Sequence, residues 1–207
     1  MHLLLDIGGV LMRRRDYAPG ISNLRIKLGI DPKVEQKLAE KNTRAIDLGI
    51  MDFEENIKEL NMEMKKVNPK FKPISSKQYF STFFRATKHN SQLVEAIRNL
   101  DNLKIHIFTN NFEENLNNYK KNMKFEEWTD NVISSHHYKI SKPDPKFYEI
   151  ALKKIGAKPG ECILLDDNPK NIATANKLGI YGVQYKTNIR AIKDIENILK
   201  KQNVTKK

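Results

Sequence analysis

The stretch LLLDIGGVL, residues 3–11, places a single acidic residue where a short apolar run meets two glycines. The three leucines form a continuous apolar run that predicts a buried strand, and the glycine pair predicts the tight turn after it. Asp6 would therefore lie at the carboxyl end of a strand, which is the edge where open α/β sheets bind ligands. An Asp that only caps the turn explains this stretch equally well, so the rest of the chain has to decide.

Length and composition describe a globular protein with a heavily charged surface. The 207 residues, 39% hydrophobic and 30% charged, can form one domain or a core domain with a smaller insertion. No apolar run approaches the ~20 residues that span a bilayer, and Asp6 interrupts the N-terminal run too early for a signal peptide. We therefore expect a cytoplasmic protein without a membrane partner. Cys162 is the single cysteine and stands in an apolar run, which indicates a core residue.

The formal net charge of +12 raises nucleic acid as a candidate partner. However, Lys and Arg are spread along the whole chain, with denser stretches only at residues 13–15 and 200–207. Neither stretch is accompanied by zinc-finger spacing or an aromatic RNA-binding signature. We expect a generally basic surface without a specific nucleic-acid site, and a nucleic-acid-associated protein remains an alternative.

Strand and helix patterns alternate over the second half of the chain. Further apolar runs predict strands at residues 105–108, 132–134, 163–165 and 180–185. Between them, Asp144 and Asn168 each precede a proline, the usual start of a helix, and a third helix is expected to open at Ser91. Strands that alternate with helices of this length predict an α/β fold with a parallel sheet covered on both faces.

Residues 17–90 have a different character, because they show helical patterns without a convincing strand. Asp31 precedes a proline, and Asp52 with Glu55 three residues later suggests a capping box. We interpret the segment as a helical insertion after the first strand. Its apolar stripe, which includes Phe80, Phe83 and Phe84, is interpreted as core packing.

Five more polar residues lie at or near the ends of predicted strands. They are, in chain order, Thr109, Asn110, Lys142, Asp166 and Asp167. Each has an ordinary explanation, because a Thr at a strand end often caps, a Lys often faces water, and an Asp pair before Asn-Pro can start a helix. Their order after Asp6 is more informative than any one of them.

In that order the residues resemble the four motifs of the haloacid dehalogenase-like (HAD) superfamily of hydrolases. Those motifs are an N-terminal Asp on a strand, a Thr or Ser on the next core strand, a Lys, and a terminal acidic pair. The resemblance covers about residues 2–185. It implies a Rossmann-like, doubly wound core formed by residues 1–16 and 91–207, with residues 17–90 as a helical cap domain inserted after the first strand.

The resemblance also implies a catalytic pair, Asp6 and Lys142. A carboxylate can attack phosphorus in line and form an aspartyl-phosphate, which divides one difficult hydrolysis into two easier steps. Because phosphoryl transfer depends mainly on positioning and charge neutralisation, a hard cation is expected, and Mg²⁺ suits oxygen ligands. The implied metal ligands are Asp6, the backbone carbonyl of Gly8 and Asp167. The implied phosphate-binding residues are Thr109, the amide of Asn110 and Lys142, and the implied second layer around the metal is Asp166 and Asn171. We therefore expect a Mg²⁺-dependent phosphohydrolase acting on a small phosphorylated metabolite, with sugar phosphates among the candidates.

Gly8 departs from the usual phosphatase pattern. Superfamily phosphatases usually carry a second Asp there, which protonates the leaving oxygen, and general acid-base groups typically contribute ~10² to 10⁴ in rate. A catalytically weak or silent phosphate-binding protein is therefore an alternative. The first motif is also similar to that of a sugar 1-phosphate phosphatase type, whose anomeric leaving group needs less protonation. Asn171 replaces a frequent carboxylate and makes the site less negative.

Other readings remain, with less support. A dehalogenase is a weaker alternative, because the terminal acidic pair suits a metal that dehalogenation does not require. His106, His136 and His137 are each expected to be structural. Neither the identity of the substrate nor the oligomeric state follows from the sequence.

Overall fold

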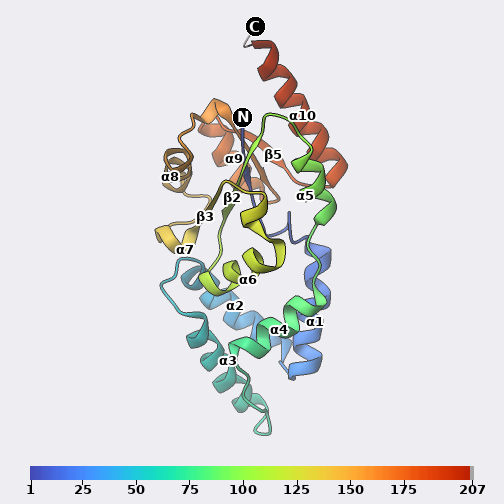
Figure 1. Ribbon diagram of the computed structural model, residues 1–207. Helices are drawn as coiled ribbons and strands as arrows, with labels where there is room; N and C mark the ends of the chain where they lie inside the picture. Colours follow the sequence, from blue (N-terminus) through green and yellow to red (C-terminus); the bar gives the residue numbers. More distant parts are fainter. Residues whose placement is uncertain (206–207) are drawn as a thin grey trace.

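A five-stranded parallel sheet lies at the centre of the protein, with strand order β3-β2-β1-β4-β5 (Figure 1). The structure is a computed structural model that describes residues 1–205, with side chains at all positions except 14–20, 86 and 203–205. The strands are β1 (His2–Leu5), β2 (Lys104–Thr109), β3 (Asn131–Ser134), β4 (Cys162–Asp166) and β5 (Tyr181–Gln184). The predicted α/β fold with a doubly wound parallel sheet is confirmed.

Several helices begin where the sequence provides a capping residue. The side chains of Asp31, Asp144 and Asn168 accept hydrogen bonds from first-turn backbone N–H groups, and Asp52 forms the predicted capping box with Glu55. The α-helices are α1 (Arg14–Leu28), α2 (Pro32–Asp47), α3 (Phe53–Val67), α4 (Ser76–Ala86), α5 (Ser91–Arg98), α6 (Glu113–Met123), α7 (Ser135–Tyr138), α8 (Pro145–Ile155), α9 (Pro169–Lys177) and α10 (Asn188–Thr205). Short 3₁₀ helices cover Phe125–Glu127 and Pro159–Glu161. Within residues 1–205, none of these helices combines the length and hydropathy that crossing a membrane requires.

Two hydrophobic clusters cover the two faces of the sheet. Leu3 and Leu5 of β1 belong to a cluster with residues of α5, α6 and α10, whereas Leu4 belongs to a cluster with residues of α8 and α9. Because successive side chains of a strand point to opposite faces, this partition follows directly from the apolar run. Cys162 and His106 are buried in strands of the sheet, as expected for structural residues.

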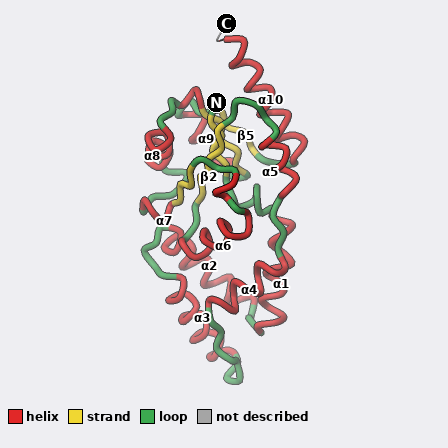
Figure 2. Tube along the Cα trace, viewed as in Figure 1, coloured by secondary structure: helices red, strands yellow, loops and turns green. Residues whose placement is uncertain are grey.

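Helices α1–α4 pack around a third hydrophobic cluster, at the end of the molecule opposite α10 (Figures 1 and 2). Its buried members come from α1 to α4 and their connections, and include Leu38, Phe53, Leu60 and Phe80. The described backbone between β1 and α5 forms helices and loops without a strand. These helices face the carboxyl edge of the sheet and enclose the space above it.

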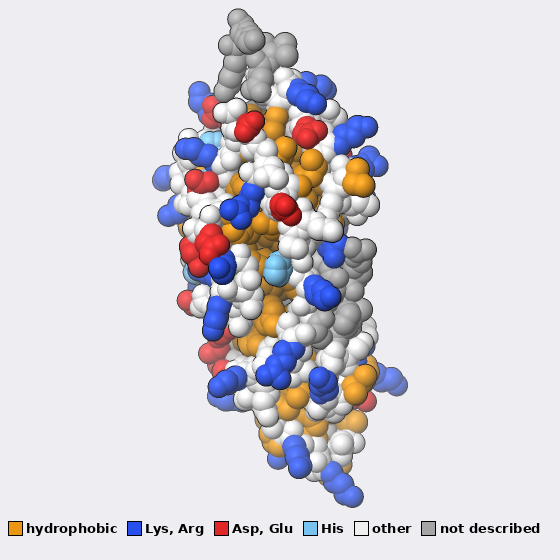
Figure 3. Space-filling model, turned by 45° about the vertical axis from the view of Figure 1, so that its right-hand side comes forward, with side chains coloured by type: hydrophobic (Ala, Val, Ile, Leu, Met, Phe, Trp, Pro, Cys, Tyr) orange, Lys and Arg blue, Asp and Glu red, His pale blue; other side chains and the backbone are white. Residues whose placement is uncertain are grey.

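Charged side chains are scattered over the face drawn in Figure 3, with Lys and Arg on both the sheet-containing half and the helical half. Acidic side chains lie between them on the upper half of that face. Of the two dense basic stretches, the side chains of Arg14, Arg15 and residues 203–207 lie outside the described part of the chain.

The strand order places β1 between β2 and β4, so the chain leaves β1 at a topological switch point. Leu5 pairs in register with Ile107 on one side and with Leu165 on the other. The N–H of Asp6 donates to the carbonyl of Leu165 at 3.0 Å, which continues the ladder by one residue. The residues just beyond these strands therefore meet at the edge where doubly wound sheets bind ligands.

Candidate functional site

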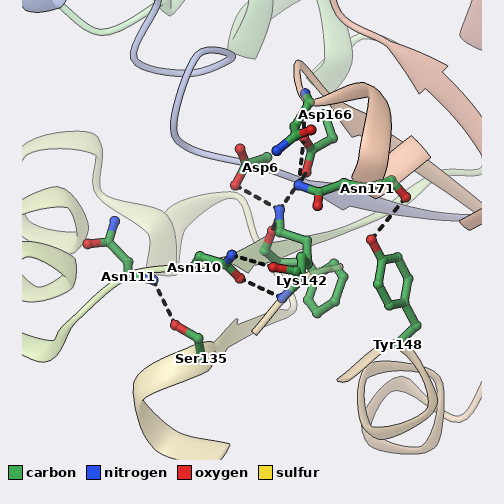
Figure 4. Close-up of polar contacts among 10 residues, drawn as sticks. Asp6, Asn110, Asn111, Ser135, Lys142, Tyr148, Asp166 and Asn171 are labelled. Carbon is green, nitrogen blue, oxygen red and sulfur yellow. Dashed lines mark hydrogen bonds and ion pairs between the residues drawn. The ribbon is translucent and has the colours of Figure 1, made fainter. Parts of the chain in front are cut away.

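Lys142 lies at the centre of the polar groups at the carboxyl edge of the sheet (Figure 4). Its Nζ is 2.9 Å from Oδ1 of Asp6 and 2.6 Å from Oδ2 of Asp166, and it donates to the carbonyl of Phe108 at 2.8 Å. The residue is only 4% exposed. Burial alone would lower the pKa of Lys142, but the Asp6 and Asp166 carboxylates outweigh it and hold the pKa above its ordinary value. The side chain is thus a buried, fixed cation.

Three carboxylates lie together beside Lys142, and two of them, Asp6 and Asp166, contact its ammonium. Asp6, Asp166 and Asp167 each offer an oxygen, and these atoms all lie within 4.8 Å of one another. Burial raises the pKa of Asp6, Lys142 lowers it, and the Asp166 and Asp167 carboxylates raise it further, with a net upward shift. The pKa of Asp6 rises mainly because burial disfavours its charged form, whereas the pKa of Lys142 rises because the Asp6 and Asp166 carboxylates stabilise its charged form. A divalent cation with a preference for oxygen ligands, such as Mg²⁺, matches this donor set.

Asp166 accepts hydrogen bonds at both of its carboxylate oxygens. Its Oδ1 accepts from the N–H of Asn168 at 2.8 Å, and the side-chain amide of Asn171 donates to both carboxylate oxygens at 3.0 and 2.9 Å. Asp166 is 0% exposed and does not line the adjacent cavity, whereas Asp6, Gly8 and Asp167 do. This arrangement suits a positioning role for Asp166 and direct cation contacts for the other three residues.

Asn171 carries an independent indication of a missing ligand. Its Nδ2 bonds Asp166, but its buried Oδ1 has no hydrogen-bond partner among the described residues. A buried acceptor without a donor costs about 1–3 kcal/mol unless water or a ligand satisfies it. Asn171 lines the same cavity, so the water shell of a bound cation would supply such a donor. The residues present therefore fit a hydrated divalent metal.

The conformation of Gly9 explains why a glycine follows β1 at this position. Gly9 adopts the left-handed conformation with φ 75°, and a Cβ at this position would overlap the carboxylate of Asp167. Only glycine combines that backbone conformation with so close an approach. Gly9 thus lets the β1 loop reach Asp167, while Gly8 lines the cavity.

Asn110 holds the backbone of the Lys142 loop. Its Oδ1 accepts from the N–H of Lys142 at 2.8 Å, and its Nδ2 donates to the Lys142 carbonyl at 2.9 Å (Figure 4). Thr109, the last residue of β2, is 1% exposed and lies behind the cavity wall, which Asn110 and Asn111 form instead. Ser135 fixes the next residue, since its Oγ accepts from the N–H of Asn111 at 3.0 Å. All the residues singled out in the sequence therefore lie at one edge of the sheet, but Thr109 is set back from the cavity.

Asp47 is a cavity residue that the sequence reasoning missed. It ends α2, and its backbone carbonyl accepts from Oγ of Ser135 at 2.5 Å, which ties this helix end to α7. Burial, and then the nearby Asp6 carboxylate, raises the pKa of Asp47 to about 7. A carboxyl group with this pKa carries a proton for part of the time near neutral pH. Nothing in the local sequence distinguishes it from a solvated helix residue.

The cavity has a volume of about 410 Å³ and lies between helices α2–α4 and the polar edge of the sheet. The cavity is lined by Phe80 and Phe83, which were interpreted from the sequence as core packing. Phe80 also belongs to the hydrophobic cluster around which α1–α4 pack, which we call the helical cluster. His136 and His137 are not among the residues that line the cavity.

Comparisons with known sequences show the family to which the chain belongs. A family model described as haloacid dehalogenase-like hydrolase matches residues 1–179. Acyl-CoA dehydrogenase family member 10 of Mus musculus is 30% identical over 131 residues, which is 61% of this chain and 12% of that protein. Flavin mononucleotide hydrolase 1 of Arabidopsis thaliana is 29% identical over 98 residues, which is 47% of this chain and 40% of that protein. (S)-2-haloacid dehalogenase 4A of Burkholderia cepacia is 30% identical over 104 residues, which is 48% of this chain and 45% of that protein. The matched regions thus cover less than half the length of each of these relatives.

Solved structures share the fold. A HAD family enzyme from Bacteroides thetaiotaomicron, in complex with magnesium and inorganic phosphate, superposes with a TM-score of 0.71 at 22% identity, covering 89% of this chain and 93% of that one. A predicted HAD-like family hydrolase from Porphyromonas gingivalis superposes with a TM-score of 0.73 at 20% identity, covering 96% and 97%. At these identities the likeness concerns the arrangement of helices and strands.

Proposed function

Because the chain belongs to the haloacid dehalogenase-like hydrolases, we propose that it is a magnesium-dependent phosphohydrolase that removes phosphate from a small phosphorylated metabolite. The observation that carries the proposal is the buried ammonium of Lys142, shared by Asp6 and Asp166 with Asp167 alongside. This arrangement suits an anion that arrives with its own divalent cation. Residues 17–90, which contain most of α1 and all of α2–α4, would act as the cap that closes over the substrate and excludes water.

In the proposed reaction Asp6 attacks the phosphorus in line, an aspartyl-phosphate forms on its carboxylate, and the P–O bond to the alcohol breaks, so that the alcohol leaves with a proton taken from water. A water molecule then hydrolyses the aspartyl-phosphate, which releases inorganic phosphate and restores the Asp6 carboxylate. Lys142 offsets the negative charge of both the phosphate and Asp6, and its fixed position means that little reorganisation accompanies the step. Thr109 and Asn110 would hold phosphate oxygens, the former only with some adjustment of the loop after β2. Asp6, the carbonyl of Gly8 and Asp167 would hold Mg²⁺, with Asp166 and Asn171 behind them. When bound, the metal would supply positive charge opposite the phosphate oxygens.

Gly8 offers no side chain to protonate the leaving group, which favours a catalytically silent phosphate-binding protein as a second candidate. Asp47 supports turnover instead, because it places a carboxyl group with a pKa of about 7 in the same cavity. Dehalogenation remains a third candidate, since relatives of both kinds match the chain. The three carboxylates favour a metal-dependent phosphatase over a metal-independent dehalogenase.

The test is phosphate release from a panel of phosphorylated metabolites, with Mg²⁺ and with EDTA, by the wild type and by Asp6→Asn. Exposed Asp101 provides a matched control, Asp101→Asn, on the far side of β2 from the site. We expect Mg²⁺-dependent release that is lost only in Asp6→Asn. Equal turnover by Asp6→Asn and the wild type would refute the assignment, and halide release from 2-chloropropionate in EDTA would favour the dehalogenase.

A further inference from the structure

The cavity beside Asp6 has a polar end and an apolar end. At the polar end are Asp6, Lys142 and Asp167. The apolar end, which we call the apolar chamber, is lined by residues of α2–α4 and of the segment before α6. They include Leu38, Ile46, Phe53, Leu60, Phe80 and Phe112. A ligand whose charged group sits against Lys142 would therefore extend its remainder into hydrocarbon.

Aromatic rings form the part of the chamber wall where the helical part meets the sheet. Phe53 and Phe112 stack with ring centroids 4.8 Å apart and an interplanar angle of 12°, and Phe80 lies 4.7 Å from Phe53 and 6.0 Å from Phe112. Phe53 and Phe80 belong to the helical cluster, whereas Phe112 precedes α6 on the sheet side. Both parts of the molecule thus contribute to one apolar surface, which favours stacking with a flat or hydrocarbon group.

Three of the polar side chains that line the chamber are bonded within the protein. Glu35 pairs with Arg25 at 3.0 Å. The Oδ1 of Asn56 accepts from Asn42 at 3.0 Å, and the Nδ2 of Asn115 donates to Asn111 at 2.8 Å. A polyhydroxylated leaving group would bring several hydroxyls to this surface, and each hydroxyl left without a partner weakens binding. An apolar leaving group avoids that penalty.

We propose, resting on the phosphohydrolase function above, that the substrate is a phosphate monoester of an apolar alcohol, with a hydrocarbon chain or ring held in the apolar chamber, and not a sugar phosphate. The cavity volume of about 410 Å³ lies within the usual range for small-molecule sites. The chamber thereby selects the alcohol, while the polar end binds the phosphoryl group common to all candidates.

The test compares three primary alkyl phosphates whose leaving groups are similar in basicity: benzyl phosphate, methyl phosphate and glucose 6-phosphate, all with Mg²⁺. We expect kcat/KM for benzyl phosphate to exceed that for glucose 6-phosphate by about 100-fold, in the range of discrimination that apolar pockets achieve. Ala39 lines the cavity from an exposed position on α2, so Ala39→Trp should narrow the chamber without disturbing a core. The ratio of benzyl to methyl phosphate turnover should fall about tenfold in this variant. Gln36→Trp, also exposed on α2 but outside the cavity lining, should leave the ratio unchanged.

Binding is measured in parallel by calorimetry with benzylphosphonate and methylphosphonate. These compounds have a carbon–phosphorus bond in place of the ester bond, so the protein cannot hydrolyse them. Benzylphosphonate should bind more tightly than methylphosphonate, and Ala39→Trp but not Gln36→Trp should weaken its binding. This result would support the apolar chamber even if no ester is hydrolysed. In that case only the proposed phosphohydrolase function would fail. The inference about the chamber is overturned if glucose 6-phosphate is turned over as fast as benzyl phosphate or faster, and such turnover would leave the phosphohydrolase function intact. Equal binding of the two phosphonates would also overturn the inference.

Discussion

Replacing Lys142 by Met removes the ammonium at the centre of the site while retaining a side chain of similar length. In the wild type its Nζ contacts Asp6 at 2.9 Å, Asp166 at 2.6 Å and the Phe108 carbonyl at 2.8 Å. Asp166 keeps its bonds from Asn168 and Asn171, so the main cost falls on Asp6. Breaking a buried ion pair by removing one partner costs about 3–5 kcal/mol. We expect the free energy of unfolding to fall by that amount in EDTA at about pH 8.

The pH dependence of this loss tests its electrostatic origin. Without Lys142 the pKa of Asp6 should rise further above its ordinary value, and a carboxyl group whose pKa is raised by folding destabilises the fold as pH increases through that range. The deficit of Lys142→Met should therefore be largest above about pH 7 and shrink toward about pH 4. Urea denaturation at both ends of this range measures it, with exposed Lys146→Met as the control. A loss below about 1 kcal/mol at high pH, or one equally large at low pH, would refute the reasoning.

Other variants test separate parts of the site. Gly9→Ala should strain a left-handed position and displace Asp167, lowering Mg²⁺ affinity about tenfold or more; unchanged affinity by calorimetry would contradict the geometry. Gly8→Asp should raise turnover of poor-leaving-group esters more than that of good ones, by up to ~10² to 10⁴, provided that Mg²⁺ affinity is retained; equal acceleration of both would show that Gly8 does not mark a missing acid. Because the pKa of Asp47 is raised to about 7, its ionisation opposes folding as pH rises through the range between its ordinary value and 7. Asp47→Asn should therefore stabilise the protein by about 1–3 kcal/mol at high pH in EDTA and have little effect near pH 4, and a loss of stability at high pH in denaturant titrations would be inconsistent with this account.

Much of the sheet was predictable because its signals are local. The leucine run before Asp6 and the Asn168-Pro169 start of α9 each define an element without reference to the rest of the chain. Parallel strands then bring their carboxyl ends to one edge, so the proximity of Asp6, Asp166 and Asp167 followed from topology alone. The order of these residues along the chain was therefore sufficient to predict that they lie close together.

The remaining features depend on contacts that no local pattern encodes. Asp47 has the spacing of an ordinary helix residue, and only the docking of α2 against α7 brings it near Asp6. Phe80 occupies an apolar stripe, but helical periodicity does not reveal whether that face packs against a neighbour or lines a cavity. The two hydrogen bonds between the Asn110 side chain and the Lys142 backbone join residues that lie far apart in sequence, so only the three-dimensional structure reveals them.

The grouping of three carboxylates at the sheet edge also has a consequence for how the whole fold responds to its surroundings. A divalent cation that binds the folded chain and not the unfolded one adds RT ln(1 + [M]/Kd) to the free energy of unfolding, about 2.7 kcal/mol at 100 times Kd. Ion binding at the sheet edge is then thermodynamically linked to the melting of every helix and strand. Chelation alone should lower the melting temperature of the protein, although no side chain has been changed.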